Sequence, residues 1–207
     1  MGTLFLLLAV LLACAPGLPA QVRPPDKPVN LDFASSRVSR EGMPEGWLLR
    51  GSAPDKYQAD LDPSVSYEGA TSALLRLQEG ALLDMDDFGT LMQFFQAKDY
   101  RGKRLRLSGY VKTESAFGIS AEDGGVGLWM RIAGRNRELL AFDNMSDRSL
   151  TGTRDWTPCE VVLDVPKESE AIYFGLLLSG YGSAWVAGLA FDAVSQDVPT
   201  TDMLPLE

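Results

Sequence analysis

The stretch "GVGLWMRIAGRNRELLAFDNM", residues 125–145, alternates apolar side chains with others along much of its length. At every second position Leu128, Met130 and Ile132 fall on one side, while Trp129 and Arg131 fall on the other. Alternation of this kind indicates a half-buried β-strand, because successive side chains of a strand point to opposite faces of the sheet. The pattern therefore predicts a strand whose outer face carries a Trp and an Arg.

The same alternation recurs along the chain and predicts an almost all-β protein. No stretch keeps a helical period over three turns, and Gly, Pro, Asp and Ser cluster between the apolar runs. Many short strands separated by turn residues are typical of antiparallel sandwiches, so we predict an antiparallel β-sandwich of the jelly-roll type. The expected strands cover residues 29–33, 46–50, 57–62, 72–78, 88–96, 103–113, 127–133, 138–144, 159–165, 171–179 and 184–194.

The strands at 127–133 and 138–144 are expected to form a hairpin closed by a loop over 134–138. Pairing Met130 with Phe142 places the apolar side chains of both strands on one face. A slip by one residue would mix the two faces. The sequence therefore predicts the register that pairs Met130 with Phe142.

In this register Trp129 lies opposite Asp143, and Arg131 lies beside them on the outer face. An aromatic ring packs against the C–H face of a sugar, and guanidinium and carboxylate groups bind hydroxyls in paired hydrogen bonds. Tyr110 and Tyr173 also point outward and join this surface if their strands lie in the same sheet. These five residues are the candidate ligand-binding residues. The alternative is an ordinary cross-strand ion pair of Arg131 with Asp143, and a Trp129 ring covered by another segment.

Composition excludes several classes of function. The 207-residue chain has a net charge of −9 and no histidine. The absence of histidine excludes Ser-His-Asp and Cys-His catalysis and His-ligated zinc. The negative charge and the scattered basic residues argue against nucleic acid as a partner. A glycosidase or lyase would use carboxylates such as Asp143 and Glu160, but no motif places two acids together on one face. We therefore expect a protein without catalytic activity.

The first twenty residues contain no charged side chain and hold an apolar run from Leu4 to Ala13. This run is shorter than the ~20 residues needed to cross a bilayer, so it predicts an export signal that is cleaved after Ala20. Alternatively, "LLAC" resembles a bacterial lipobox in which Cys14 is acylated. The expected location is periplasmic or secreted, or lipid-anchored at the cell envelope. Membrane attachment is expected only if Cys14 carries lipid.

The remaining boundaries follow from composition. Residues 21–28 are Pro-rich and charged and read as a linker, residues 29–195 form the β-sandwich domain, and residues 196–207 are expected to be a flexible tail. Cys159 lies in a strand-like run, which favours a buried and inert thiol.

Several segments, taken in order, resemble a known type of domain: "NLDF", "YRGKRLRLSGYVKT", "GLWMRIAG", "LAFDNM", "AIYFGLLLSGYGSAWV" and "LAFDAV". They resemble the galactose-binding-like jelly rolls of carbohydrate-binding modules. The likeness is closer to bacterial accessory domains found beside exported hydrolases and in some transcriptional regulators. The resemblance implies a non-catalytic module that binds a glycan or a cell-envelope component and needs no cofactor. Because this fold carries varied functions, a structural or protein-interaction domain with a separate protein partner is the alternative.

The resemblance also bears on calcium. In such modules a Glu after the first "NxxF" and an Asp pair in the last strand commonly hold a structural calcium ion. This sequence has Ala34, Ala187 and Gly188 at those positions. Because Ala and Gly supply no side-chain oxygen, the comparison implies that this chain lacks the ion and binds no metal there.

Overall fold

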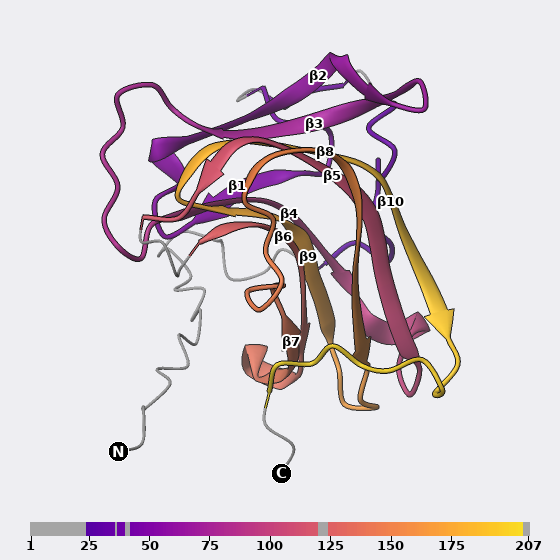
Figure 1. Cartoon of the computed structure of the whole chain (residues 1–207). Coiled ribbons are helices and arrows are strands. Elements are labelled where there is room, and N and C mark those ends of the chain that lie inside the picture. Colours follow the sequence, from indigo (N-terminus) through magenta and orange to yellow (C-terminus); the bar gives the residue numbers. More distant parts are fainter. Residues whose placement is uncertain (1–23, 36, 40–41, 120–123, 205–207) are drawn as a thin grey trace, which may run out of the picture.

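The structure is a computed structural model that describes residues 24–35, 37–39, 42–119 and 124–204. Two five-stranded antiparallel sheets pack face to face, which confirms the predicted β-sandwich (Figure 1). One sheet has the strand order β1-β4-β9-β6-β7 and is called the Trp129 sheet. The other has the order β2-β3-β10-β5-β8 and is called the Tyr110 sheet.

Each strand predicted from residue 46 onward overlaps an observed strand, although the strand predicted at 57–62 extends to residue 67 and the one predicted at 159–165 begins at residue 152. The strand predicted at 88–96 and the one predicted at 171–179 have the bounds that the alternation indicates. The Trp129 sheet consists of β1 (Leu48–Gly51), β4 (Phe88–Gln96), β9 (Ala171–Ser179), β6 (Gly125–Ala133) and β7 (Leu139–Asp143). The Tyr110 sheet consists of β2 (Tyr57–Tyr67), β3 (Ala70–Leu77), β10 (Tyr181–Val194), β5 (Arg104–Phe117) and β8 (Gly152–Asp164). The short 3-10 helices are η1 (Pro54–Lys56), η2 (Ala97–Asp99) and η3 (Arg135–Arg137).

The predicted strand at 29–33 is wrong. Asn30 has φ 51° and Phe33 has φ 53°, values that belong to the left-handed region and interrupt an extended chain. Phe33 is nevertheless buried, and its ring lies 5.1 Å from that of Trp47. The apolar pattern "NLDF" thus marks a turn that contributes to the core.

Alternation assigns the buried faces of β5 and β9 correctly. In β5 the side chains of Leu105 and Leu107 are fully buried, and in β9 those of Ile172 and Phe174 are too. Each such side chain contributes ~1.5–3 kcal/mol to folding relative to an exposed one. Cys159 is buried as expected, and this burial raises the pKa of its thiol to about 11.

The two sheets are also joined at one edge by the end of the chain. Residues 195–204, called the C-terminal strap, run from β10 past β8 to β7 (Figure 1, yellow). The Thr201 N–H donates to the Val162 carbonyl in β8 at 2.8 Å, and the Met203 N–H donates to the Phe142 carbonyl in β7 at 2.9 Å. The segment for which the sequence predicts a flexible tail therefore makes hydrogen bonds to both sheets as far as Met203.

Within the described ranges, no helix is long and apolar enough to cross a membrane. The predicted export signal over residues 1–20 and the alternative lipidation site at Cys14 lie outside the described residues.

Candidate functional site

The predicted register of the β6–β7 hairpin is wrong by one residue over most of its length. Met130 pairs with Asp143 and Arg131 pairs with Phe142. The predicted register holds only for Ala133 and Leu139, next to the loop, and an irregularity follows in which β7 contributes an extra residue. A one-residue bulge moves every later side chain of the strand to the opposite face. Asp143 therefore shares the inward face of Met130 and does not lie beside Trp129.

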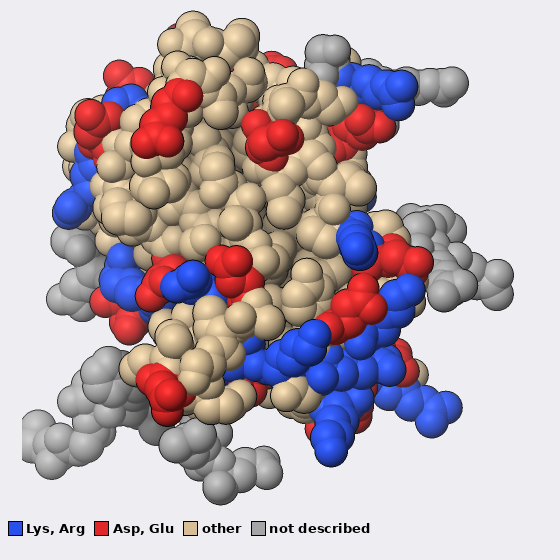
Figure 2. All heavy atoms as spheres, turned by 90° about the vertical axis from the view of Figure 1, so that its right-hand side faces the viewer, with Lys and Arg blue, Asp and Glu red and all other residues tan. Residues whose placement is uncertain are grey.

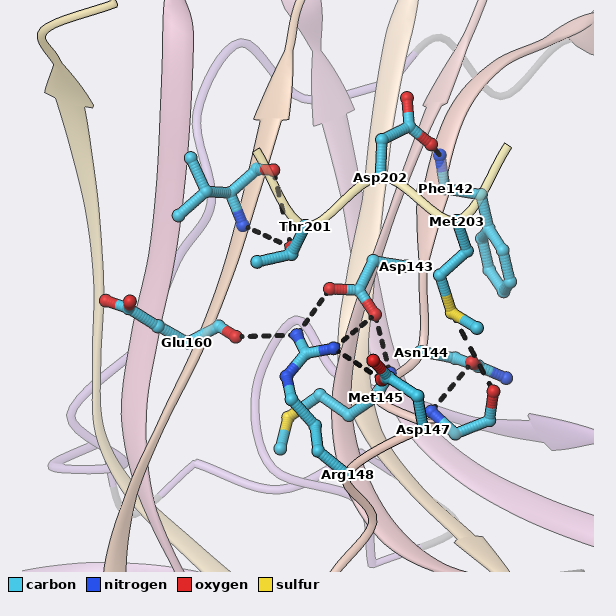
Figure 3. Close-up of polar contacts among 12 residues, drawn as sticks. Phe142, Asp143, Asn144, Met145, Asp147, Arg148, Glu160, Thr201, Asp202 and Met203 are labelled. Carbon is cyan, nitrogen blue, oxygen red and sulfur yellow. Dashed lines mark hydrogen bonds and ion pairs between the residues drawn. The ribbon is translucent and has the colours of Figure 1, made fainter. Parts of the chain in front are cut away.

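Asp143 is fully buried and paired with an arginine other than Arg131 (Figure 3). Both terminal nitrogens of Arg148 donate to its carboxylate, and the Met145 N–H donates to it at 2.7 Å. Arg148 Nη2 also donates to the carbonyl of Glu160 in β8 at 3.1 Å. The Asp143–Arg148 pair thus connects the segment after β7 to the other sheet. Because its oxygens accept these bonds, Asp143 holds this part of the fold together.

The outer face of the Trp129 sheet carries a row of four neighbouring side chains, one from each of β4, β9, β6 and β7. Phe94 pairs with Tyr173, Tyr173 with Arg131, and Arg131 with Phe142. All four are half-buried. The rings of Phe94 and Tyr173 stack with centroids 5.4 Å apart and planes at 22°. We call these four residues the Arg131 row.

Trp129 lies next to this row on the same outer face. It pairs with Gly175 of β9, and its Nε1 donates at 2.7 Å to the hydroxyl of Thr90 in β4. The indole therefore reaches across β9, the strand between β6 and β4. Trp129 is only 3% exposed, so its ring is buried next to the Arg131 row and is not itself a contact surface.

Arg131 has an unused hydrogen-bond donor. Its Nη2 donates to the carbonyl of Arg137 at 2.7 Å, but its Nε is buried and finds no partner within the described ranges of the chain. A buried donor without an acceptor costs ~1–3 kcal/mol, so an acceptor from a bound molecule would be favourable here.

Tyr110 lies on the outer face of the other sheet, away from Trp129. Its ring stacks on Tyr67 with centroids 4.0 Å apart, and Trp156 meets Tyr67 edge-on at 5.5 Å. A hydrogen bond with Tyr110 raises the pKa of Tyr67 to about 12. We call these three residues the Tyr110 cluster. The structure therefore brings together Trp129, Arg131 and Tyr173 from the predicted set and separates Tyr110 and Asp143 from them.

Sequence reasoning missed two members of the Arg131 row. Phe142 was assigned to the core because the bulge in β7 leaves no sequence signal. Phe94 had a signal in the doublet Phe94–Phe95, because adjacent side chains of a strand point to opposite faces. Phe95 is fully buried, and Phe94 takes the outer face.

Among the described residues, no group of three or more His, Cys, Asp or Glu side chains is placed to hold a metal ion. Ala34 is exposed in the turn after Phe33, and Gly188 has φ 61° at an irregularity of β10. The expectation that the calcium site of related modules is lost stays a prediction.

Comparison with known proteins supports the fold. No protein-family model matches the chain. A solved structure described as "CBM4 structure and function" has a TM-score of 0.50 and 13% identity, and the match covers 81% of this chain and 100% of that one. The chain has the jelly-roll β-sandwich fold of carbohydrate-binding modules. The enzymatically active domain of tailspike protein 4 from bacteriophage CBA120 has a TM-score of 0.54 and 12% identity, over 79% of this chain and 22% of that one. At these identities the similarity concerns the fold alone.

A similar sequence comes from a bacterium. The uncharacterized HTH-type transcriptional regulator YbfP of Bacillus subtilis (strain 168) is 38% identical over 159 residues, which cover 77% of this chain and 51% of that protein. The chain thus spans about half the length of this relative.

Proposed function

We propose that this protein is a non-catalytic binding module whose ligand is a glycan or another hydroxyl-rich component of the cell envelope. The ligand binds to the outer face of the Trp129 sheet, along the Arg131 row. The observation that carries this proposal is the buried Nε of Arg131, which finds no acceptor in the described part of the chain and lies on the strand next to that of Tyr173. The carbohydrate-binding-module fold supports it.

The chemistry of the row suits a sugar. The rings of Phe94 and Tyr173 offer apolar area to the C–H groups of a pyranose, while Arg131 offers a donor to a hydroxyl or ring oxygen. The buried ring of Trp129 packs beside the row, and its hydrogen bond to Thr90 holds the indole in one position. Such support lowers the entropy lost when a ligand binds.

The absence of catalysis is part of the proposal and has two supports. The carboxylate of Asp143 is buried in a pair with Arg148, and the thiol of Cys159 is buried with a raised pKa. Neither group is placed as the acid, base or nucleophile of a reaction on the Arg131 row.

Calorimetric titration with a panel of cell-wall oligosaccharides tests the proposal. Tyr173→Ala should weaken binding by ~2 kcal/mol, which is typical of an aromatic anchor and equals more than a tenfold loss at ~1.4 kcal/mol per decade. The matched control is Tyr110→Ala, which removes the same ring from the outer face of the opposite sheet. Equal losses in the two variants, or no binding to any member of the panel, would contradict the proposal.

We also propose that the protein is exported, with residues 1–20 removed or Cys14 lipidated. N-terminal sequencing and the intact mass of the native protein test this. A mature chain that starts at Met1 without lipid would contradict it.

A second candidate function is protein binding through the Tyr110 cluster. Three half-buried aromatic rings on one outer face favour it, because Tyr and Trp are enriched at protein interfaces. A protein partner on this surface would be lost in Trp156→Ala and kept in Tyr173→Ala. The reverse pattern is expected for a glycan on the Arg131 row.

A further inference from the structure

Charged side chains are distributed unevenly on the Trp129 sheet. Its five strands contain three of them: Arg50 in β1, Arg131 in β6 and Asp143 in β7. Arg50 pairs with Thr90, and Arg131 pairs with Tyr173, so both arginines belong to the outer face. Asp143 points inward. The strands of this sheet therefore present two cations and no carboxylate outward, in a protein whose net charge is −9.

Neither arginine has a carboxylate partner within the described part of the chain. Arg50 Nη1 donates to the adjacent carbonyl of Leu49 at 2.8 Å, and Arg131 Nη2 donates to the carbonyl of Arg137. The Nε of Arg131 has no hydrogen-bond partner among the residues that the structure describes. Carbonyl contacts leave the positive charges of both guanidinium groups without a counter-charge from the described residues.

The Tyr110 sheet is different, because most of its cations have carboxylate partners. Of the five Lys and Arg side chains in its strands, Arg76 and Arg154 bond instead to the side chain of Gln58 and the carbonyl of Thr151. On the side of the molecule where β5 and β10 lie, several Lys and Arg side chains have Asp and Glu side chains next to them, and a larger group of Lys and Arg side chains gathers at the lower right (Figure 2). Three of these pairs join neighbouring strands. They are Arg104 with Asp164 at 2.8 Å, Arg106 with Asp192 at 3.3 Å, and Lys112 with Asp155 at 3.1 Å.

We infer that the ligand of the Trp129 sheet is an acidic oligosaccharide, in which uronic-acid carboxylates pair with Arg131 and Arg50. This inference rests on the proposed function and specifies the class of glycan. A guanidinium group binds a carboxylate through two parallel hydrogen bonds, and such charge-assisted pairs are stronger than bonds to neutral hydroxyls. The unmatched positive charge selects the acidic ligand over a neutral one of the same shape.

The spacing of the two arginines favours an oligomer. Arg50 lies in line with Thr90, Leu177 and Gly127, and Gly127 precedes Arg131 by four residues in β6. With strands ~4.8 Å apart and ~3.3 Å per residue, three strand spacings and four residues place the two Cα atoms ~20 Å apart. Trp129 lies on β6 between Gly127 and Arg131, so the part of the outer face between the two arginines is largely apolar. A single sugar is too short to reach both arginines.

Calorimetry with a galacturonic-acid hexamer and its carboxyl-reduced neutral counterpart tests the inference, since the two probes share length and linkage. The acidic hexamer should bind at least ~tenfold more tightly, because the reduced hexamer cannot form charge-assisted pairs with the two arginines. The preference should shrink as salt is added. Arg131→Gln and Arg50→Gln should each weaken the acidic probe at least ~fivefold. Arg50→Gln should leave the neutral probe nearly unchanged, whereas Arg131→Gln, which also removes a donor to sugar hydroxyls, should weaken the neutral probe by a smaller factor than the acidic one. Thermal unfolding of each variant verifies that it is folded.

The matched control is Arg76→Gln. Arg76 is exposed on the outer face of the Tyr110 sheet and bonds to Gln58, so this variant removes the same charge from the opposite side. Equal weakening in Arg76→Gln would show an effect of net charge and overturn the inference. Equal binding of both hexamers, reduced by Tyr173→Ala, would overturn the inference while the proposed function stands. Failure of both hexamers and of the whole oligosaccharide panel would overturn both.

Discussion

The indole nitrogen of Trp129 in β6 donates a 2.7 Å hydrogen bond to the hydroxyl of Thr90 in β4, although β9 lies between these two strands. Thr90 in turn donates to the carbonyl of Leu176 in β9 at 2.8 Å. This chain of two hydrogen bonds links three strands on the outer face of the sheet. Both side chains are buried, so the connection is shielded from water.

Replacing Thr90 by valine should destabilise the fold through this connection. Thr90→Val keeps the volume but leaves the indole N–H of Trp129 buried without an acceptor, which costs ~1–3 kcal/mol. Urea denaturation measures the change in free energy of unfolding. Thr90→Ser keeps the hydroxyl and serves as the control, with a smaller loss. Equal stability of Thr90→Val and the native protein would show that the bond does not matter.

Trp129→Ala should destabilise the protein by ~3–5 kcal/mol, because a large buried ring leaves a cavity that the sheet cannot fill. If the ring instead lay exposed as a platform for a sugar, Trp129→Ala would leave the protein folded. Trp129→Phe, which keeps a ring without the N–H, should lose less. Urea denaturation distinguishes a buried ring from an exposed sugar platform. A fully stable Trp129→Ala variant would show that burial of the ring does not stabilise the fold.

Breaking the pair of Asp143 with Arg148 should be costly. Asp143 is fully buried, while the side chain of Arg148 is 33% exposed. Asp143→Ala leaves the arginine without its main partner, and we expect a loss of ~3 kcal/mol, at the lower end of the range for buried pairs. Asp147 also contacts Arg148 but is 66% exposed, so Asp147→Ala should cost less than ~1 kcal/mol. Similar losses in the two variants would mean that burial of Asp143 is unimportant.

Cys159 should be unreactive in the folded protein. Burial raises the pKa of its thiol to about 11, so almost no thiolate exists at pH 8. Iodoacetamide should modify Cys159 on the order of 100-fold more slowly in the native state than in denaturant, because only the thiolate reacts. Peptide mapping separates this site from Cys14, and Cys159→Ser verifies the assignment. Equal native and denatured rates would contradict the burial.

The raised pKa of Cys159 also makes the free energy of unfolding depend on pH. The pKa of the thiol in the folded state lies above its unfolded value of ~8.5. The buried neutral thiol therefore makes its full contribution to the free energy of unfolding at pH values below ~8.5. It is lost as the pH rises from there toward the folded pKa of about 11. Between these limits Cys159→Ser should lose less stability with rising pH than the native protein, as measured by urea denaturation at each pH.

Removing the C-terminal strap should expose the edges of β7 and β8. A chain ending at Ser195 loses the bonds of Thr201 to Val162 and of Met203 to Phe142. At ~1 kcal/mol for each net hydrogen bond, we expect a loss of ~2 kcal/mol or more and a tendency to associate through the open edges. Urea denaturation and light scattering measure the two effects. Thr201→Val, which removes only the hydroxyl that accepts from the Val162 N–H, should show a smaller loss.

The sequence by itself determined the class of fold and the face of most strands. Alternation with a period of two is a local signal, and it placed Leu105, Ile172 and Phe174 in the core because each strand buries one face of its own pattern. The same reasoning placed Trp129 and Arg131 on an outer face, and the register of β6 with β9 agrees with it.

Only the tertiary structure decided which of these side chains lie together. One extra residue in β7 turned Asp143 inward and Phe142 outward, and the bulge has no signature in the local alternation. The order of strands put Tyr173 next to Arg131 and Tyr110 on the other sheet, because strands adjacent in a sheet need not be adjacent in the chain. The burial of Trp129 likewise depends on Thr90, thirty-nine residues away along the chain. Local periodicity fixes the direction of a side chain, whereas its neighbours depend on long-range pairing.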